Sequence, residues 1–145
     1  MPLPETERVL LGPGPSLIPP RVMRALAAPV LSHLDPEFVP LLDDVRASLK
    51  RVFRADENAL TLATSGTGTS AMEAAVANSV SEGMRGVVIV TGYFGDRLAQ
   101  IFERYGAAVR RIDVEWGRAV DPQRLRDELR REGADVVGKI GRAHV

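Results

Sequence analysis

Apolar positions in the second half of the chain fall into continuous runs and helical stripes. Residues 86–91, GVVIVT, form a run of the kind that is buried on both faces of a parallel sheet. A stripe at helical spacing follows and stops at Gly106: Phe94, Leu98, Ile101, Phe102 and Tyr105. Residues 107–114 predict another strand, Asp121-Pro122 opens a helix that closes at Gly133, and residues 134–137 begin one more strand. This alternation predicts an α/β fold with a mainly parallel sheet flanked by helices and right-handed crossovers.

The first half is less regular. Residues 9–20, VLLGPGPSLIPP, hold four prolines and two glycines, which predicts an extended arm over residues 1–20. Pro20 suits the first turn of a short helix that runs to about Leu26. Asp35-Pro36-Glu37 then predicts the start of an amphipathic helix that ends near Arg54, with Arg46 and Lys50 on its polar side.

The sequence LTLATSGTGTSAMEAAVANSV, residues 60–80, is the most informative segment. Residues 60–64 predict a strand, residues 65–70 a tight loop and the alanine-rich remainder a helix. Two glycines permit close backbone approach, hydroxyls add donors, and the helix dipole favours negative charge, so the loop predicts a phosphate site. The alternative is a helix start stabilised only by its own cap, since Ser70 and Glu73 match the capping box S-x-x-E.

The type of phosphate follows from what surrounds the loop. Residues 66–71 match the dinucleotide pattern G-x-G-x-x-G/A, but the next strand ends in Thr91, Gly92 and Tyr93 without the acidic residue that a ribose requires. A Walker loop is excluded because no Lys-Ser or Lys-Thr follows the glycines. A monophosphate ester therefore fits best.

Charge and composition exclude several partner classes. Lys plus Arg and Asp plus Glu number 19 each, which indicates neither a nucleic-acid nor a membrane-surface partner. The chain has no cysteine, so disulfides and thiol catalysis are excluded. No stretch approaches membrane length and the N-terminus resembles no signal peptide, so we expect a soluble, cytoplasmic protein without bound metal.

Five motifs in order, LLGPGPS, HLDPEF, TSGTGTSAMEAA, TGYFGDR and VEWGRAVDP, resemble the N-terminal part of class V aminotransferases of the alanine/serine–glyoxylate type. These are fold-type-I enzymes that use pyridoxal 5′-phosphate (PLP), and the resemblance runs from about Leu10 to Val137. It implies an arm over residues 1–20 and a partial large PLP-binding domain over residues 21–137. The cofactor agrees with the monophosphate expected from the loop.

The resemblance also implies roles for individual residues. Thr67, Gly68 and Thr69 would bind the cofactor phosphate, and Phe94 would stack on the pyridine ring, where the family often has a larger aromatic. Core packing at the start of its helix is the alternative for Phe94.

The N-terminal arm has an implied role as well. Gly12, Pro13 and Gly14, with Pro15, would line the substrate side of the pocket, or the arm would instead pack at a subunit interface. His33 precedes a helix start, where a structural hydrogen bond is favoured over acid–base chemistry.

The chain departs from the family in lacking catalytic residues. Transamination needs a lysine that bonds the cofactor, an aspartate for the pyridinium nitrogen and usually an arginine for the substrate carboxylate, and in the family these come later. Only Lys50 and Lys139 are lysines, and neither is credible in that role. We therefore expect an inactive N-terminal fragment of a homodimeric enzyme acting on an amino acid and a 2-oxo acid. A PLP-dependent lyase or desulfurase and a non-catalytic phosphate-binding module are the alternatives.

Residues 138–145, GKIGRAHV, form a tail of different character. Gly138, Lys139, Gly141 and Arg142 interrupt the apolar pattern of the strand begun at Ala134. Residues 140–145 can be encoded by ATC GGA AGA GCA CAC GTC, and a preceding AG completes a lysine codon; this resembles the start of a widely used sequencing adapter. We expect the tail to be an assembly artefact without a specific partner in the fold. A divergent natural terminus is the alternative.

Overall fold

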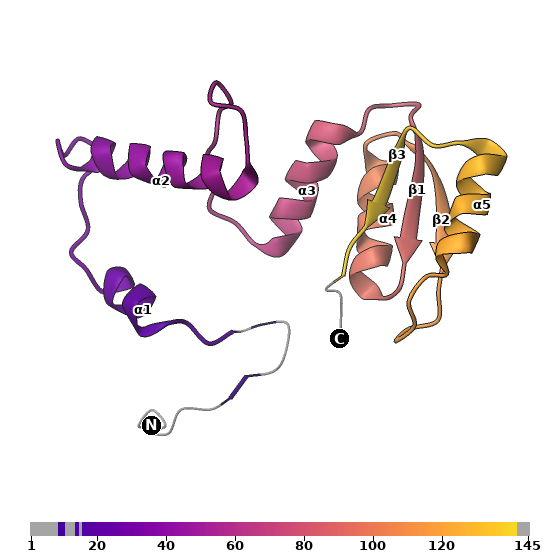
Figure 1. The fold of residues 1–145 in the computed structure, drawn as a ribbon, viewed down its shortest axis with the longest axis horizontal. Coiled ribbons are helices and arrows are strands. Elements are labelled where there is room, and N and C mark those ends of the chain that lie inside the picture. Colours follow the sequence, from indigo (N-terminus) through magenta and orange to yellow (C-terminus); the bar gives the residue numbers. More distant parts are fainter. Residues whose placement is uncertain (1–8, 11–13, 15, 142–145) are drawn as a thin grey trace. The chain divides into compact units, whose positions relative to one another are not determined.

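The structure is a computed structural model that describes residues 9–10, 14 and 16–141. The chain divides into two compact units, Met1–Ala63 and Thr64–Val145, whose elements are labelled in Figure 1. Among the described residues, no helix is long and apolar enough to cross a membrane.

The unit Thr64–Val145 is an α/β layer structure built on a parallel sheet. Its elements in chain order are α3 (Gly68–Ser79), β1 (Arg85–Val90), α4 (Tyr93–Arg104), β2 (Ala108–Asp113), α5 (Pro122–Glu132) and β3 (Val136–Lys139). The three strands lie in the order β2-β1-β3 and both pairings are parallel. The predicted alternation of strands and helices and the predicted fold class are confirmed.

The strand order places the crossover helices on opposite faces of this sheet. The step from β1 to β2 and the step from β2 to β3 run in opposite directions, so right-handed crossovers put α4 and α5 on opposite sides. Neighbouring arginines of β2 agree with this, because side chains alternate along a strand. Arg111 pairs with Asp96 of α4 and Arg110 pairs with Glu132 of α5.

The core of this unit lies between the sheet and the helices α3 and α4. Met72 and Val76 of α3 pack with Val88 and Val90 of β1 and with an inner row of α4 that includes Phe102. Glycines on two adjacent strands make room for the Phe102 ring. A Cβ at Gly86 would lie 2.8 Å from it and one at Gly138 would lie 3.0 Å from it.

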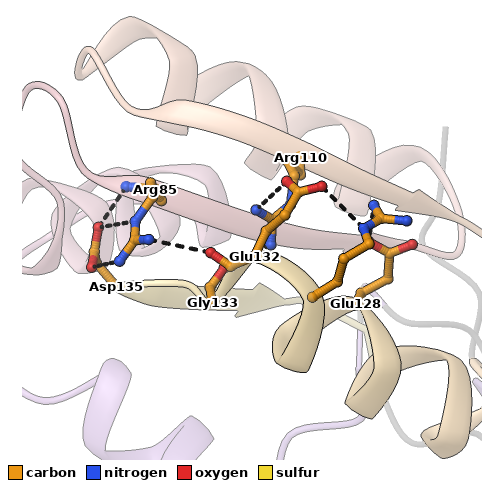
Figure 2. A network of polar contacts seen from close by, with 7 residues as sticks. Arg85, Arg110, Glu128, Glu132, Gly133 and Asp135 are labelled. Carbon is orange, nitrogen blue, oxygen red and sulfur yellow. Dashed lines mark hydrogen bonds and ion pairs between the residues drawn. The ribbon is translucent and has the colours of Figure 1, made fainter.

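A group of ion pairs closes the amino end of the sheet, shown in Figure 2. Arg85, the first residue of β1, donates to both carboxylate oxygens of Asp135, with Nη2 to Oδ1 at 2.9 Å and Nε to Oδ2 at 3.2 Å. Arg110 Nη1 contacts Glu132 Oε2 at 2.8 Å, and its Nη2 donates to the Gly133 carbonyl. These contacts attach the end of α5 and the start of β3 to the two preceding strands.

The unit Met1–Ala63 contains two helices, α1 (Pro20–Leu26) and α2 (Phe38–Phe53). The first agrees with the predicted bounds. The second begins after the predicted cap, because Asp35 Oδ1 accepts from the Glu37 N–H in a turn that precedes the helix. None of the described residues of this unit is buried.

The prediction that Arg46 and Lys50 lie on the solvent-exposed side of α2 is wrong. Arg46 and Lys50 are half-buried, whereas apolar side chains of the same helix such as Val52 and Phe53 are exposed. Lys50 Nζ donates to the Glu57 carbonyl and the Arg46 carbonyl accepts from the Thr61 hydroxyl, so the segment after α2 folds back over the basic side.

Two further expectations are corrected by the sheet. Residues 60–64 form no strand: Leu60 and Leu62 are exposed, and the described residues offer no ladder partner, without which an extended segment is not a strand.

The tail, conversely, does not leave the fold at Gly138. Gly138 pairs with Val88 and Lys139 with Ile89, because the pairing of β3 with β1 uses backbone N–H and C=O groups, which every residue except proline supplies. Ile140 also packs against the core of this unit. The expectation that the tail has no partner is thus wrong for residues 138–140, whereas its origin as an artefact stays a prediction. Residues 142–145 lie outside the described part.

Candidate phosphate site at the start of helix α3

Helix α3 begins with a side-chain cap formed by the Thr-Gly-Thr-Ser segment. Thr67 is the N-cap; its Oγ1 accepts from the Ser70 N–H at 3.4 Å, and Ser70 Oγ accepts from the Thr67 N–H at 3.3 Å. The predicted capping box of Ser70 with Glu73 is therefore wrong. The box lies three residues earlier, because the glycine at position 68 already adopts helical geometry and Thr67 supplies the extended conformation that a cap requires.

The cap leaves two donors at the helix end free for a ligand. Within the described part of the chain, the N–H groups of Gly68 and Thr69 donate to no protein acceptor. A Cβ at Gly68 would meet nothing within 4 Å, so its backbone is open to an approaching group. At Gly66 a Cβ would lie 2.9 Å from the Ser70 Cβ, so this turn excludes a side chain. Free N–H groups at the positive end of a helix dipole are the donor set that a phosphate monoester needs.

Phe94 lies at the start of the next helix. Residues 91–92 connect β1 to α4, and Phe94 is the second residue of α4 with 52% of its surface exposed. Its ring meets that of Tyr93 edge to face, with centroids 5.3 Å apart and an interplanar angle of 80°. Plain core packing, the alternative considered for Phe94, does not fit this exposure. Its stacking on a cofactor ring stays a prediction.

The topology brings both helix starts to one end of the sheet. Figure 1 shows the strands running toward the end from which α3 and α4 set out, so Thr67, Gly68, Thr69 and Phe94 all belong to the carboxyl end of the strands. Ligands of open α/β sheets bind at this end. In the described residues no hydrogen bond or ring contact joins the two groups directly. A hollow of about 200 Å³ between α3, α4 and β3 is lined by other residues, Ala75 and Phe102 among them.

The remaining candidates are less informative. Gly12 and Pro13 lie outside the described residues, and Gly14 is exposed, so the substrate role of this segment stays a prediction. His33 is exposed and makes no side-chain hydrogen bond with the described residues, which gives no support to the expected structural bond. Lys139 is exposed on β3. The described residues contain no cluster of three or more metal-ligating side chains.

Three residues near Phe94 were missed by the sequence reasoning. Tyr93 adds a second exposed ring, which its position directly before Phe94 could have indicated. Asp96 and Arg111 form an ion pair at 2.7 Å between α4 and β2. No local pattern could have indicated this pair, because the contact depends on the parallel pairing of β1 with β2.

Comparisons with known proteins agree with the motifs. No family model matches the chain. An uncharacterized aminotransferase of Methanocaldococcus jannaschii is 37% identical over 123 residues, which are 85% of this chain and 31% of that protein. The alanine–glyoxylate aminotransferase of Drosophila melanogaster is 36% identical over 124 residues, 86% of this chain and 31% of that protein.

A solved structure extends the match to the fold. The crystal structure of alanine–glyoxylate aminotransferase from Nostoc sp. superposes with a TM-score of 0.78 and 42% identity, covering 96% of this chain and 37% of that one. The chain thus spans about a third of the length of the relatives that it matches. The sequence motifs, the parallel α/β fold and these matches agree that the chain belongs to the class V aminotransferase family, alanine–glyoxylate aminotransferase-like.

Proposed function

We propose that this chain is part of a PLP-dependent aminotransferase that moves an amino group from alanine or serine to glyoxylate or a similar 2-oxo acid. The observation that carries the proposal is the start of α3, where the Gly68 and Thr69 N–H groups have no protein acceptor in the described residues. The relatives that share this segment are named as aminotransferases, two of them for alanine and glyoxylate. A lyase, a desulfurase or a non-catalytic module is not favoured by these matches.

The residues present fit the phosphate and ring of PLP. The Gly68 and Thr69 N–H groups and the Thr69 hydroxyl would hold the phosphate, while Thr67 shapes the turn through its bonds with Ser70. Phe94, half-exposed beside Tyr93, would cover one face of the pyridine ring. When bound, PLP supplies an electron sink for bonds at the substrate α-carbon. These residues would orient the cofactor, and no lysine lies among them to transfer a proton.

The remaining parts of the proposal concern the whole protein. We propose that it is a cytoplasmic homodimer and that Gly12, Pro13 and Gly14 border the substrate side of its pocket. The 145 residues alone are expected to have no transaminase activity. Lys50 belongs to α2, where its Nζ donates to the Glu57 carbonyl, and Lys139 belongs to β3, so neither lysine lies at the helix starts that would hold the cofactor.

The test is to sequence and express the reading frame that continues beyond the Val137 codon in the source DNA. We expect the longer protein, supplied with PLP, to convert alanine and glyoxylate into pyruvate and glycine and to sediment as a dimer. Thr69→Ala should weaken PLP binding, measured by equilibrium dialysis. An inactive longer protein, or PLP affinity unchanged by this substitution, would contradict the proposal. For the isolated chain, stoichiometric borohydride trapping of PLP on Lys50 would refute its expected inertness.

A further inference from the structure

Arg111 of β2 bridges two carboxylates on the α4 side of the sheet. Its Nη1 lies 2.7 Å from Asp96 Oδ1 and its Nη2 lies 3.1 Å from Asp113 Oδ1. Arg111 and Asp113 are two residues apart on one strand, so both side chains stand on the same face. One planar guanidinium thus connects the end of β2 to the first turn of α4, a geometry that a lysine could not reproduce.

Both carboxylate oxygens of Asp96 have a side-chain partner. Oδ1 faces Arg111, and Oδ2 accepts from Gln100 Nε2 at 2.7 Å one helical turn further on. Its backbone N–H donates to the Gly92 carbonyl at 3.1 Å, which closes the first turn of α4. The next residue toward the N-terminus, Gly95, is buried against the end of β1, where a Cβ would lie 2.9 Å from the Val90 Cα.

Phe94 depends on this turn for its position. Half of its surface is exposed and its one described ring contact is with Tyr93, which is itself 65% exposed, so the buried core does not hold the ring. Asp96 follows two residues later and is the acidic residue of the same turn. A pair with side-chain exposures of 40% for Asp96 and 34% for Arg111 adds little to global stability. Its consequence is therefore local, in the placement of the turn.

We propose that Asp96 and Arg111 are positioning residues that hold the first turn of α4 so that the Phe94 ring is presented to the cofactor ring. The inference rests on the proposed function, because it assumes that Phe94 stacks on PLP. Neither residue touches the cofactor, and their effect on binding passes through the backbone of residues 92–96.

The experiment compares two probes on the 145-residue chain. Pyridoxine 5′-phosphate carries both ring and phosphate but has no aldehyde, so it cannot react with surface lysines; inorganic phosphate carries no ring. Phe94→Ala should weaken pyridoxine 5′-phosphate by about three- to tenfold, as expected for one lost stacking contact, and leave inorganic phosphate unchanged. Asp96→Asn and Arg111→Gln should reproduce this selective loss. Combined with Phe94→Ala they should add nothing, because the ring they position is gone.

Glu128→Gln is the matched control, since it removes a helix carboxylate that pairs with an arginine away from Phe94, Arg131 of α5 at 2.8 Å. It should leave both affinities unchanged. Hydrogen exchange at the Gly95 and Asp96 amides gives a readout without ligand, and it should speed up in Asp96→Asn and not in Glu128→Gln.

The outcomes distinguish a failure of the positioning role of Asp96 and Arg111 from a failure of the proposed cofactor site. If Phe94→Ala acts selectively but Asp96→Asn and Arg111→Gln do not, or if they weaken both probes equally, the positioning role is refuted and the cofactor site stands. If the native chain binds pyridoxine 5′-phosphate no better than inorganic phosphate and Phe94→Ala changes nothing, ring stacking is refuted and the positioning role with it.

Discussion

The two units of this chain carry similar helical patterns and differ in what those patterns bury. In Thr64–Val145 the stripe of α4 lies in a core whose innermost residues, Val88 and Ala99, have no exposed surface. In Met1–Ala63 the apolar stripe of α2 is exposed, with Val52 75% and Phe53 74% exposed, and none of the described residues of this unit is buried. An amphipathic pattern thus predicts which face of a helix is apolar, but a partner element is needed before that face contributes to stability.

The partner of α4 is the sheet, which is formed by local sequence. β1, α4 and β2 follow one another within thirty residues, and right-handed crossovers bring them together without any other segment. The unit Met1–Ala63 has helices but no strand in its described residues, so its described part offers α2 no sheet to pack on.

Phe102→Ala against Phe53→Ala is the strongest test of this difference. Phe102 is 4% exposed and fills the space above Gly86 and Gly138, so its truncation should lower the free energy of unfolding by about 3–5 kcal/mol. Phe53 is 74% exposed, so its truncation should change that free energy by less than about 0.5 kcal/mol. Urea denaturation measures both. Equal costs would mean that α2 is packed in solution, and the contrast between the units would be lost.

Much of the fold could be predicted because local chemistry fixes it. Asp121, the residue before Pro122, caps the start of α5 by accepting from the Gln123 N–H, and Gly133 ends the helix with a φ of 67°. Both ends of α5 could therefore be predicted from the sequence. Gly106, with a φ of 80°, likewise follows α4 closely as predicted.

The expectations that were wrong depend on neighbours that a pattern does not show. Residues 60–64 have strand composition but no ladder partner in the described part, and Gly138 extends a strand only because β1 is beside it. In the candidate site, the glycine-threonine turn could be read from sequence, whereas the Asp96–Arg111 pair could not, since it depends on sheet register.

Gly138→Ala tests where the folded unit ends. A Cβ at this position would lie 3.0 Å from Phe102 Cζ and 3.2 Å from Leu98 Cδ2, so we expect a loss of about 1–3 kcal/mol from overpacking. Gly14→Ala in the other unit meets nothing within 4 Å and should be close to neutral. Thermal denaturation compares the two variants. A neutral Gly138→Ala would show that residues 138–139 do not pack on β1 in solution, as the interpretation of the tail as an artefact expects.

Thr67→Ala tests the helix start in the same paired way. Thr67 caps α3 through its side chain, whereas Glu37, at the corresponding position of α2, makes no such bond. Loss of the Thr67 cap should cost about 1 kcal/mol, and Glu37→Ala should cost much less. Thr67→Ser should restore stability, because it keeps the accepting oxygen. If Thr67→Ser fails to restore it, the methyl group rather than the cap is responsible.

The smallest expected effect concerns acid stability and the ion pair at the amino end of the sheet. Side-chain hydrogen bonds from Arg85, followed by its backbone N–H, lower the pKa of Asp135 from 3.8 to about 2. Because the folded pKa lies below the unfolded one, the native state holds fewer protons in this range, and the pair's contribution is complete above pH 3.8 and is lost as the pH falls toward 2. The exposed position of both groups keeps the effect modest.

Asp135→Asn should therefore flatten the dependence of unfolding free energy on pH between about 4 and 2, measured by urea denaturation at each pH. Arg85→Gln should flatten it similarly, and the double variant should add little, because each single change already breaks the same pair. The pair joins residues fifty positions apart, whereas the Arg46–Asp43 pair of α2 joins neighbours on one helix. Only the former can link β3 to β1 and so contribute to the folded unit as a whole. An unchanged slope in Asp135→Asn would show that Asp135 titrates alike in the folded and unfolded chain and that the pair is not maintained in solution.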